Sequence, residues 1–464
     1  MNAFTLNTRL QAGEITAQDL TAQALLRAVE DQHHCLISIN QPRALAQAAQ
    51  ADLRLQQGQK SALIGLPVVA EDSLLVKDWN SSGGSRMLAN FAPPFSAEVI
   101  NRLEQAGLIL IAKTNLGELH MGGAESSFFG AVTHPLDHSR LCGGAAAAVA
   151  AGITPFALAV DSGGEIRREA AQAGVTCIKP TYGTVSRFGI IANISSCEQV
   201  AVVAKTIREG AALLSHIAGH DPKDGTSRPQ THYTYPIGQS IQGQKIAVIE
   251  NYLGADTGTE QIDAVNRAAA QLQQAGAIVE KIHLHYADYA HLALHIMAAA
   301  EGCNNISRFD GVKYGYRAAA YKNIEELYCN SRSQAFGAEV KERAILGVYY
   351  LAKEQYQGYY LKALQLRGLL ADEISRLFHN YQLALTPVAA AGPYAAGEDA
   401  MGRLSFRDSF YTGIPSLLGL PAVTLAYDQG GPLPAGIQLF GPQMADTAVM
   451  NAAAALADSA KGGN

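Results

Sequence analysis

The sequence predicts an α/β protein whose largely parallel sheet is wrapped by helices. Two stretches alternate strand, helix and strand: LPVVAED, AEVINRLEQA and LILIA follow Gly65, and KIAVIE, a helix over 259–275 and AIVEKI follow Gln244. This order is typical of parallel strands, which need a long and usually helical connection. The chain has 464 residues, of which 48% are hydrophobic and 16% charged, so it can bury a large core.

The N-terminal residues predict two helices. Thr16 and Asp19 form a capping-box pattern that opens a helix through about Asp31. Its apolar stripe is expected to contain Leu20, Leu26 and Val29. A second helix is expected from about Pro42 to Gly58, because proline suits a first helical turn and glycine often ends a helix.

Local signals also predict the later elements. Ser96 is the expected cap of the helix AEVINRLEQA, and Gly107 ends it. The Ala-rich run from Ala145 predicts a tightly packed helix, and most of the region from about Tyr286 to Phe378 is expected to be helical. QLALTP and AVTLAY predict strands, and a helix is expected over about 445–458. Residues 1–60 should form a helical cover on one compact unit over 61–464.

Composition excludes several classes of protein. The net charge is −6, from 35 basic and 41 acidic residues, and no basic run suggests nucleic-acid binding. The sequence contains neither a secretion signal nor a membrane span, which predicts a cytoplasmic protein. Its six scattered cysteines lack a C-x-x-C pair, which favours reduced thiols over disulfides or a zinc site. No feature indicates a cofactor.

Several stretches, in the same order, resemble the amidase signature family. They include GLPVVAEDS, SSGGS, AGLILIAKTNLGELHMG, DSGGEIRREAA, KPTYGTVSRFG and GLPAVTLAY. The resemblance covers almost the whole chain. It is closest to the branch of glutamine-dependent amidotransferase A subunits and 1-carboxybiuret hydrolases. It implies an α/β fold with a central mixed, mostly parallel sheet that helices cover on both sides.

The resemblance also implies where the family's catalytic groups would lie. In active members a lysine, a cis-serine and a nucleophilic serine relay a proton, while N–H groups of a glycine turn hold the oxyanion. The matching positions here are Glu71, Leu141 and Glu165, and the shortened loop after Arg140 contains no serine. A carboxylate cannot be turned into an alkoxide. The sequence therefore predicts that serine-type amide hydrolysis is absent and that none of the three positions is catalytic.

A few residues remain candidates for ligand binding. The glycine turn is preserved, and Arg343 matches a family arginine that would hold a substrate carboxylate. The candidate ligand-binding residues are Gly163, Gly164, Arg343 and Asp408. His291 and His295 have the i, i+4 spacing of metal ligands, but no H-E-x-x-H motif accompanies them, so no metal site is expected.

If the fold is kept, Glu71 and Glu165 should face the same buried pocket. Two neighbouring carboxylates cannot both ionise cheaply, so the pocket needs compensation. The sequence offers a shared proton, a bound cation or a salt bridge. The candidate salt-bridge partners are Arg140, Arg167 and Arg168. We expect a polar network centred on the glutamates to fill the pocket, rather than a hydrolytic or metal site.

These observations lead to three functional hypotheses. The first is a catalytically inactive amidase homologue that serves as a binding or structural subunit. Its partner would be a small helical companion, an amidase-like subunit or a second copy of the chain. The second is an amidohydrolase that acts on a small carboxylated amide with Glu71 or Glu165 as the base. The third is a sensor that binds a small ligand in the same pocket.

Overall fold

The computed structural model describes residues 2–59, 61–123, 125–398, 403–427 and 432–461. Within these residues an 11-stranded sheet runs in the order β1-β3-β2-β6-β8-β7-β12-β13-β11-β9-β10, and β4 pairs with β5 separately. The strands are β1 (Leu36–Ile39), β2 (Pro67–Glu71), β3 (Ile109–Thr114), β4 (Thr133–His134), β5 (Asp137–Leu141), β6 (Phe156–Asp161), β7 (Thr176–Lys179), β8 (Gln199–Ala204), β9 (Lys245–Ile249), β10 (Ile278–Ile282), β11 (Leu383–Pro387), β12 (Ala422–Tyr427) and β13 (Ala435–Phe440).

The large sheet is mixed. Parallel pairs form two blocks, β3-β2-β6 and β11-β9-β10. Antiparallel pairs connect these blocks through β8, β7, β12 and β13, and β1 adds antiparallel to β3 at one edge. Most of these strands are buried along their whole length, so they read as continuous apolar runs.

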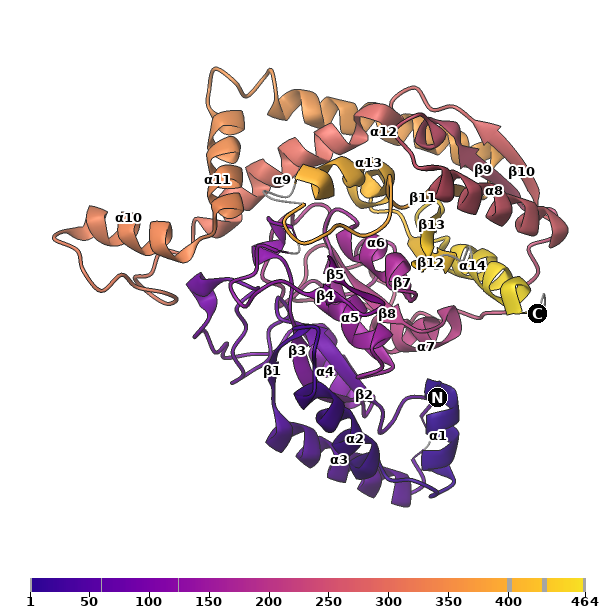
Figure 1. Cartoon of the computed structure of the whole chain (residues 1–464), viewed down its shortest axis with the longest axis horizontal. Coiled ribbons are helices and arrows are strands. Elements are labelled where there is room, and N and C mark those ends of the chain that lie inside the picture. Colours follow the sequence, from indigo (N-terminus) through magenta and orange to yellow (C-terminus); the bar gives the residue numbers. More distant parts are fainter. Residues whose placement is uncertain (1, 60, 124, 399–402, 428–431, 462–464) are drawn as a thin grey trace.

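Helices flank the sheet, and the predicted α/β fold with a mixed central sheet is confirmed (Figure 1). Figure 1 also shows α10 and α11 projecting away from the sheet. The helices are α1 (Ala3–Gln11), α2 (Ala17–Val29), α3 (Gln41–Gln56), α4 (Glu98–Gln105), α5 (Gly144–Ala150), α6 (Glu165–Gln172), α7 (Ile207–Ile217), α8 (Thr259–Gln274), α9 (Ala290–Ile306), α10 (Ile324–Ala335), α11 (Ala338–Leu351), α12 (Tyr360–Asn380), α13 (Arg403–Leu417) and α14 (Asp446–Lys461).

The predicted start of α2 is confirmed, but of its predicted apolar stripe only Leu20 is buried. The Thr16 hydroxyl accepts a hydrogen bond from the Asp19 backbone, and the Asp19 carboxylate accepts one from the Thr16 backbone, which completes the capping box. Leu26 and Val29 are 64% and 73% exposed. The face with the small residues Ala24 and Ala28 turns inward instead, because small side chains allow close packing against the neighbouring elements.

The predicted cap of α4 is also wrong. Ala97 occupies the N-cap position, and no side chain caps this helix. The Ser96 hydroxyl instead accepts a hydrogen bond from the Lys77 backbone N–H at 2.9 Å. The Ser96 side chain, which the local sequence predicts as the helix cap, therefore makes a contact with a residue distant in sequence instead.

The other elements predicted along the chain are present, with bounds close to those expected. The central strands β6, β7, β8 and β13 are additional to the prediction. Strand β1 lies within residues 1–60 and pairs with β3, while the division of the chain at residue 60 stays a prediction. No helix in the described part of the chain is long and apolar enough to cross a membrane.

Candidate active site

Two carboxylates meet at one edge of the sheet. Glu71 ends β2, and Glu165 begins α6, which follows β6. Because β2 and β6 are parallel neighbours, their carboxyl ends lie side by side. Both side chains line a cavity of about 40 Å³, which has room for a water molecule. The buried pocket that the sequence predicts for Glu71 and Glu165 is therefore present.

A glycine turn sets the position of Glu165. Gly164 is the N-cap of α6 and has a φ of 102°, a left-handed conformation that favours glycine. A Cβ atom at this position would lie 2.3 Å from the Cβ of Thr412. The Thr412 hydroxyl also donates a hydrogen bond to the Gly163 carbonyl at 2.8 Å. The two candidate glycines thus form a rigid turn next to Glu165.

His120 provides the positive charge in the pocket. Its Nε2 lies 2.9 Å from Glu71 Oε1, to which the Ser73 hydroxyl also donates a hydrogen bond at 2.5 Å. Burial alone would lower the pKa of His120, but the carboxylates of Glu71, Glu165 and Glu198 outweigh it and raise the pKa to about 9. We therefore expect an imidazolium at neutral pH.

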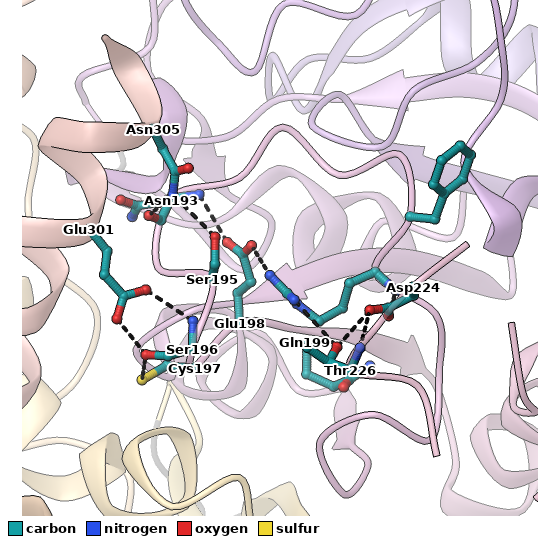
Figure 2. Close-up of polar contacts among 12 residues, drawn as sticks. Asn193, Ser195, Ser196, Cys197, Glu198, Gln199, Asp224, Thr226, Glu301 and Asn305 are labelled. Carbon is teal, nitrogen blue, oxygen red and sulfur yellow. Dashed lines mark hydrogen bonds and ion pairs between the residues drawn. The ribbon is translucent and has the colours of Figure 1, made fainter. Parts of the chain in front are cut away.

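The backbone around His120 is strained. Leu119 and His120 have φ values of 51° and 55°, and non-glycine residues adopt this region rarely. The Asn193 side chain holds the turn by donating to the His120 carbonyl at 2.7 Å. Asn193 is itself fixed by its backbone N–H, which donates to Glu198 Oε2 at 2.9 Å (Figure 2). The strained backbone of His120 is therefore held by the buried hydrogen bonds of Asn193 and Glu198, and not by a conformational preference of Leu119 or His120.

Glu169 is the third carboxyl group of the cavity. It lies one turn after Glu165, so both side chains project from the same face of α6. Its carboxyl group packs over Gly143 in the short loop before α5. A Cβ atom at Gly143 would be 2.0 Å from Glu169 Oε2. The missing Cβ at Gly143 therefore leaves the space that Glu169 occupies.

The two carboxyl groups on α6 are difficult to ionise. Burial raises the pKa of Glu169 to about 8; Arg168 opposes this shift, and the carboxylates of Glu165 and Glu71 add to it. Burial also raises the pKa of Glu165, against the positive charges of Arg343, Arg168 and His120. The cavity thus holds a proton-carrying Glu169 and a Glu165 carboxyl of increased basicity at neutral pH.

The salt-bridge partners proposed from the sequence pair with carboxylates other than Glu71 and Glu165, although the charge of Arg168 does lower the pKa of Glu165. Arg140 pairs at the surface with Asp137 and Glu398. Arg167 is fully buried and pairs with Asp161 at 2.6 Å, while Arg168 lies 3.8 Å from Glu169. His120 is the group that sequence reasoning missed. Its only signal is its place within AKTNLGELHMG, and the sequence gives no indication that its ring reaches Glu71.

Leu141 lies outside the cavity. It ends β5 and is buried, and its backbone N–H donates to the Tyr394 carbonyl at 2.8 Å. The next two residues, Cys142 and Gly143, line the cavity instead. The loop before α5 therefore lines the cavity with backbone and small side chains.

A second cavity of about 30 Å³ adjoins the first through Glu165 and His120. Arg343 lines it from α11 and, among the described residues, forms no ion pair within 4 Å. The Ser162 hydroxyl also lines it and is buried without a hydrogen-bond partner in the described part of the chain. An unpaired guanidinium beside an unsatisfied hydroxyl favours an anionic ligand group at this point.

Asp408 belongs to a buried polar network and does not line this cavity. Its carboxylate accepts hydrogen bonds from the Tyr394 hydroxyl and the Ala390 N–H, and it lies 3.7 Å from Arg168. The neighbouring Ser409 lines the cavity. The structure therefore separates Asp408 from the other candidate ligand-binding residues.

The two histidines of α9 differ in position. His295 lines the cavity beside Arg343, while the rings of both His291 and His295 pack against Phe406. Burial, together with the charges of Arg343 and His291, lowers the pKa of His295 to about 3, so its ring is neutral. In the described part of the chain, no group of three histidine, cysteine or acidic side chains could hold a metal ion.

Replacing Gly143 with alanine is expected to lower the free energy of unfolding by about 1–3 kcal/mol, because the new Cβ would collide with Glu169. The φ of −82° at Gly143 suits any residue, so the collision alone should matter. Urea denaturation measures the loss, and Gly225→Ala, where a Cβ meets open space, is the control. An equal loss in both variants would contradict the predicted collision.

Comparison with known proteins identifies relatives over the whole fold. The sequence model of the family described as Amidase matches residues 19–450. The A subunit of glutamyl-tRNA(Gln) amidotransferase from Neisseria meningitidis serogroup B is 40% identical over 98% of this chain and 97% of its own length. The protein of that name from Agathobacter rectalis is 37% identical over 98% and 92%, respectively.

Solved structures agree. The crystal structure of the glutamyl-tRNA(Gln) amidotransferase A subunit from Thermotoga maritima has a TM-score of 0.77 and 28% identity, and covers 94% of this chain and 91% of that one. A protein of a vestigial complex linked to the origin of an s-triazine catabolic enzyme has a TM-score of 0.86 at 23% identity over 99% and 98% of the two chains, which shows the fold alone.

The expectation of a catalytically inactive homologue is wrong. Relatives that are 39–40% identical over 98% of the chain are named as a subunit of an amidotransferase, which is an enzyme. The expectation rested on three positions judged against the family's serine relay. Similarity over the rest of the chain outweighs these three positions.

Proposed function

The chain belongs to the amidase signature family, and from that premise we propose that it is an enzyme that cleaves the carboxamide of a small substrate bearing a carboxylate. One observation carries this proposal: the cavity that places Glu165, Glu169 and His120 together adjoins Arg343, which forms no ion pair with any residue that the structure describes. A basic carboxylate, a proton donor and an anion-binding group are the parts that hydrolysis of such an amide needs.

In the proposed reaction, Glu165 accepts a proton from water while the water oxygen adds to the amide carbon. The N–H groups of the Gly163–Gly164 turn face the oxygen that becomes negative. The protonated carboxyl of Glu169 or the imidazolium of His120 gives a proton to the leaving nitrogen, so that the C–N bond breaks and an amine or ammonia departs. Arg343 pairs with the carboxylate of the substrate.

Replacing Glu165 with glutamine is expected to reduce amide hydrolysis by at least about 100-fold, because the glutamine cannot take the proton from water. Release of ammonia from glutamine and other carboxylated amides by the purified chain measures the rate. Glu354→Gln, at an exposed position, is the matched control. The proposal fails if the native chain releases no ammonia across the panel, or if Glu165→Gln and the control are equally active.

We also propose that the chain assembles with another protein. Its relatives are named as subunits, which supports a partner without identifying it. A small helical companion, an amidase-like subunit and a second copy remain the alternatives. Co-purification from the native source followed by light scattering tests this, and a protein that always runs alone as a monomer would contradict it. The cytoplasmic location predicted from the sequence is part of the same proposal.

A further inference from the structure

A large groove follows one face of α12, apart from the carboxyl cluster. Its volume is about 750 Å³, within the range of sites that hold small organic ligands. Its lining consists of Leu364, Arg367, Gly368, Ala371, Ile374, Ser375, Phe378, His379, Leu418, Leu420, Pro442 and Gln443. The α12 residues recur every three or four positions, so the groove runs along the helix. No residue of the proposed amide chemistry lines it.

The floor of the groove is apolar. Ile374 and Leu420 are 2% and 5% exposed and belong to a buried hydrophobic cluster. Leu364, Phe378 and Leu418 are partly buried and pack against the same cluster. The floor is therefore the outer surface of a packed core, and its shape does not depend on a flexible loop. An apolar ligand would gain by covering it.

The lining contains basic side chains but no acidic ones among the described residues. Arg367 and His379 line the groove, and no aspartate or glutamate does, although the chain as a whole has a net charge of −6. Within the described residues Arg367 forms no ion pair within 4 Å. Its recorded hydrogen bond, to the Ser196 carbonyl, is long at 3.4 Å. A half-buried guanidinium with so little compensation can pair with an anion from outside.

We propose that the α12 groove binds an apolar carboxylic acid. The carboxylate pairs with the guanidinium of Arg367, and the hydrocarbon part lies on Phe378, Leu418 and Leu420. The ligand is a small molecule, because the volume of the groove lies within the range of small-molecule binding sites. The site is separate from the carboxyl cluster, so the proposal does not depend on the amide chemistry.

Decanoate tests the proposal by isothermal titration calorimetry with the purified full chain. One molecule is expected to bind per chain, and decanol, which has the same chain without the charge, is expected to bind at least about 10-fold more weakly. Butyrate, which keeps the charge but loses most of the apolar surface, should also bind weakly. Absence of saturable decanoate binding, or equal binding of decanol, overturns the proposal.

Three variants place the site. Arg367→Gln is expected to weaken decanoate binding about 10-fold and to remove the preference over decanol. Ala371→Trp should block binding, because position 371 is exposed within the groove and a large ring there fills it without entering the core. Arg376→Gln, exposed on the same helix outside the groove, should bind as the native chain does. Native-like binding by both Arg367→Gln and Ala371→Trp overturns the proposal, and if one variant fails to fold, the other decides.

Discussion

Replacing Arg167 with methionine is expected to lower the free energy of unfolding by about 3–5 kcal/mol, because the change leaves the charge of Asp161 buried without its partner. Both side chains are fully buried, and the Arg167 Nε lies 2.6 Å from Asp161 Oδ2. The guanidinium also donates to the Ser416 hydroxyl at 2.6 Å and to the Thr412 carbonyl at 3.0 Å. Methionine keeps much of the volume but none of these bonds.

Urea denaturation of the native chain and the variant measures this loss. Arg376→Met, which changes an exposed arginine on α12, is the matched control and should shift stability by less than about 0.5 kcal/mol. The double variant Asp161→Asn, Arg167→Met should lose less than the sum of the two single variants, since each removes the same pair. A loss of stability for Arg167→Met no larger than for Arg376→Met would show that the buried ion pair between Arg167 and Asp161 does not stabilise the folded state.

The second large effect is a loss of stability as the pH rises. The pKa of His120 is raised from about 6.5 in an unfolded chain to about 9 in the folded protein. The folded state keeps a proton that the unfolded state releases, so this contribution is complete below pH 6.5 and disappears by pH 9. It amounts to roughly 3 kcal/mol at most. Glu169 acts in the same direction between about pH 4.5 and 8.

Variants separate these contributions. His120→Gln should flatten the pH dependence between pH 6.5 and 9, and Glu169→Gln should do so between pH 4.5 and 8, so the two variants differ most clearly at the outer ends of these windows. Lys179 acts in the opposite direction above about pH 8, because burial lowers its pKa to about 8. The comparison is therefore the difference between native and variant urea midpoints at each pH. If this difference stays constant from pH 5 to 9 for His120→Gln, the ion pair with Glu71 does not set the pKa of His120.

The sequence predicted elements best where a local signal marks them. The capping box at Thr16 and Asp19, and Gly107 after α4, report nearby backbone geometry and are read correctly. The central strands β6, β7, β8 and β13 are missing from the prediction. A short buried strand is apolar on both faces, so it lacks the alternation that distinguishes a strand from a buried helix.

For the candidate site, too, the sequence predicts some features correctly and others incorrectly. The sequence predicts that Glu71 and Glu165 face one pocket, because both positions match catalytic positions of the family, and both side chains do line one cavity. It also favours the arginines near Glu165 as compensating charges. Arg167 instead pairs with Asp161. Arg168 donates a hydrogen bond to the Tyr394 hydroxyl and lies near Asp408. Closeness in sequence does not indicate which way a side chain on a helix points.

The sequence by itself determined the family, the α/β fold and the replacement of the expected lysine and serine by glutamates at positions 71 and 165. Only the tertiary structure decided how those carboxylates are tolerated. A strained turn brings His120 to 2.9 Å from Glu71, and Glu169 fills the space that Gly143 leaves open. The reason is physical: motifs record residue types along the chain, whereas a buried charge is stabilised by whichever group folding places within a few ångströms of it.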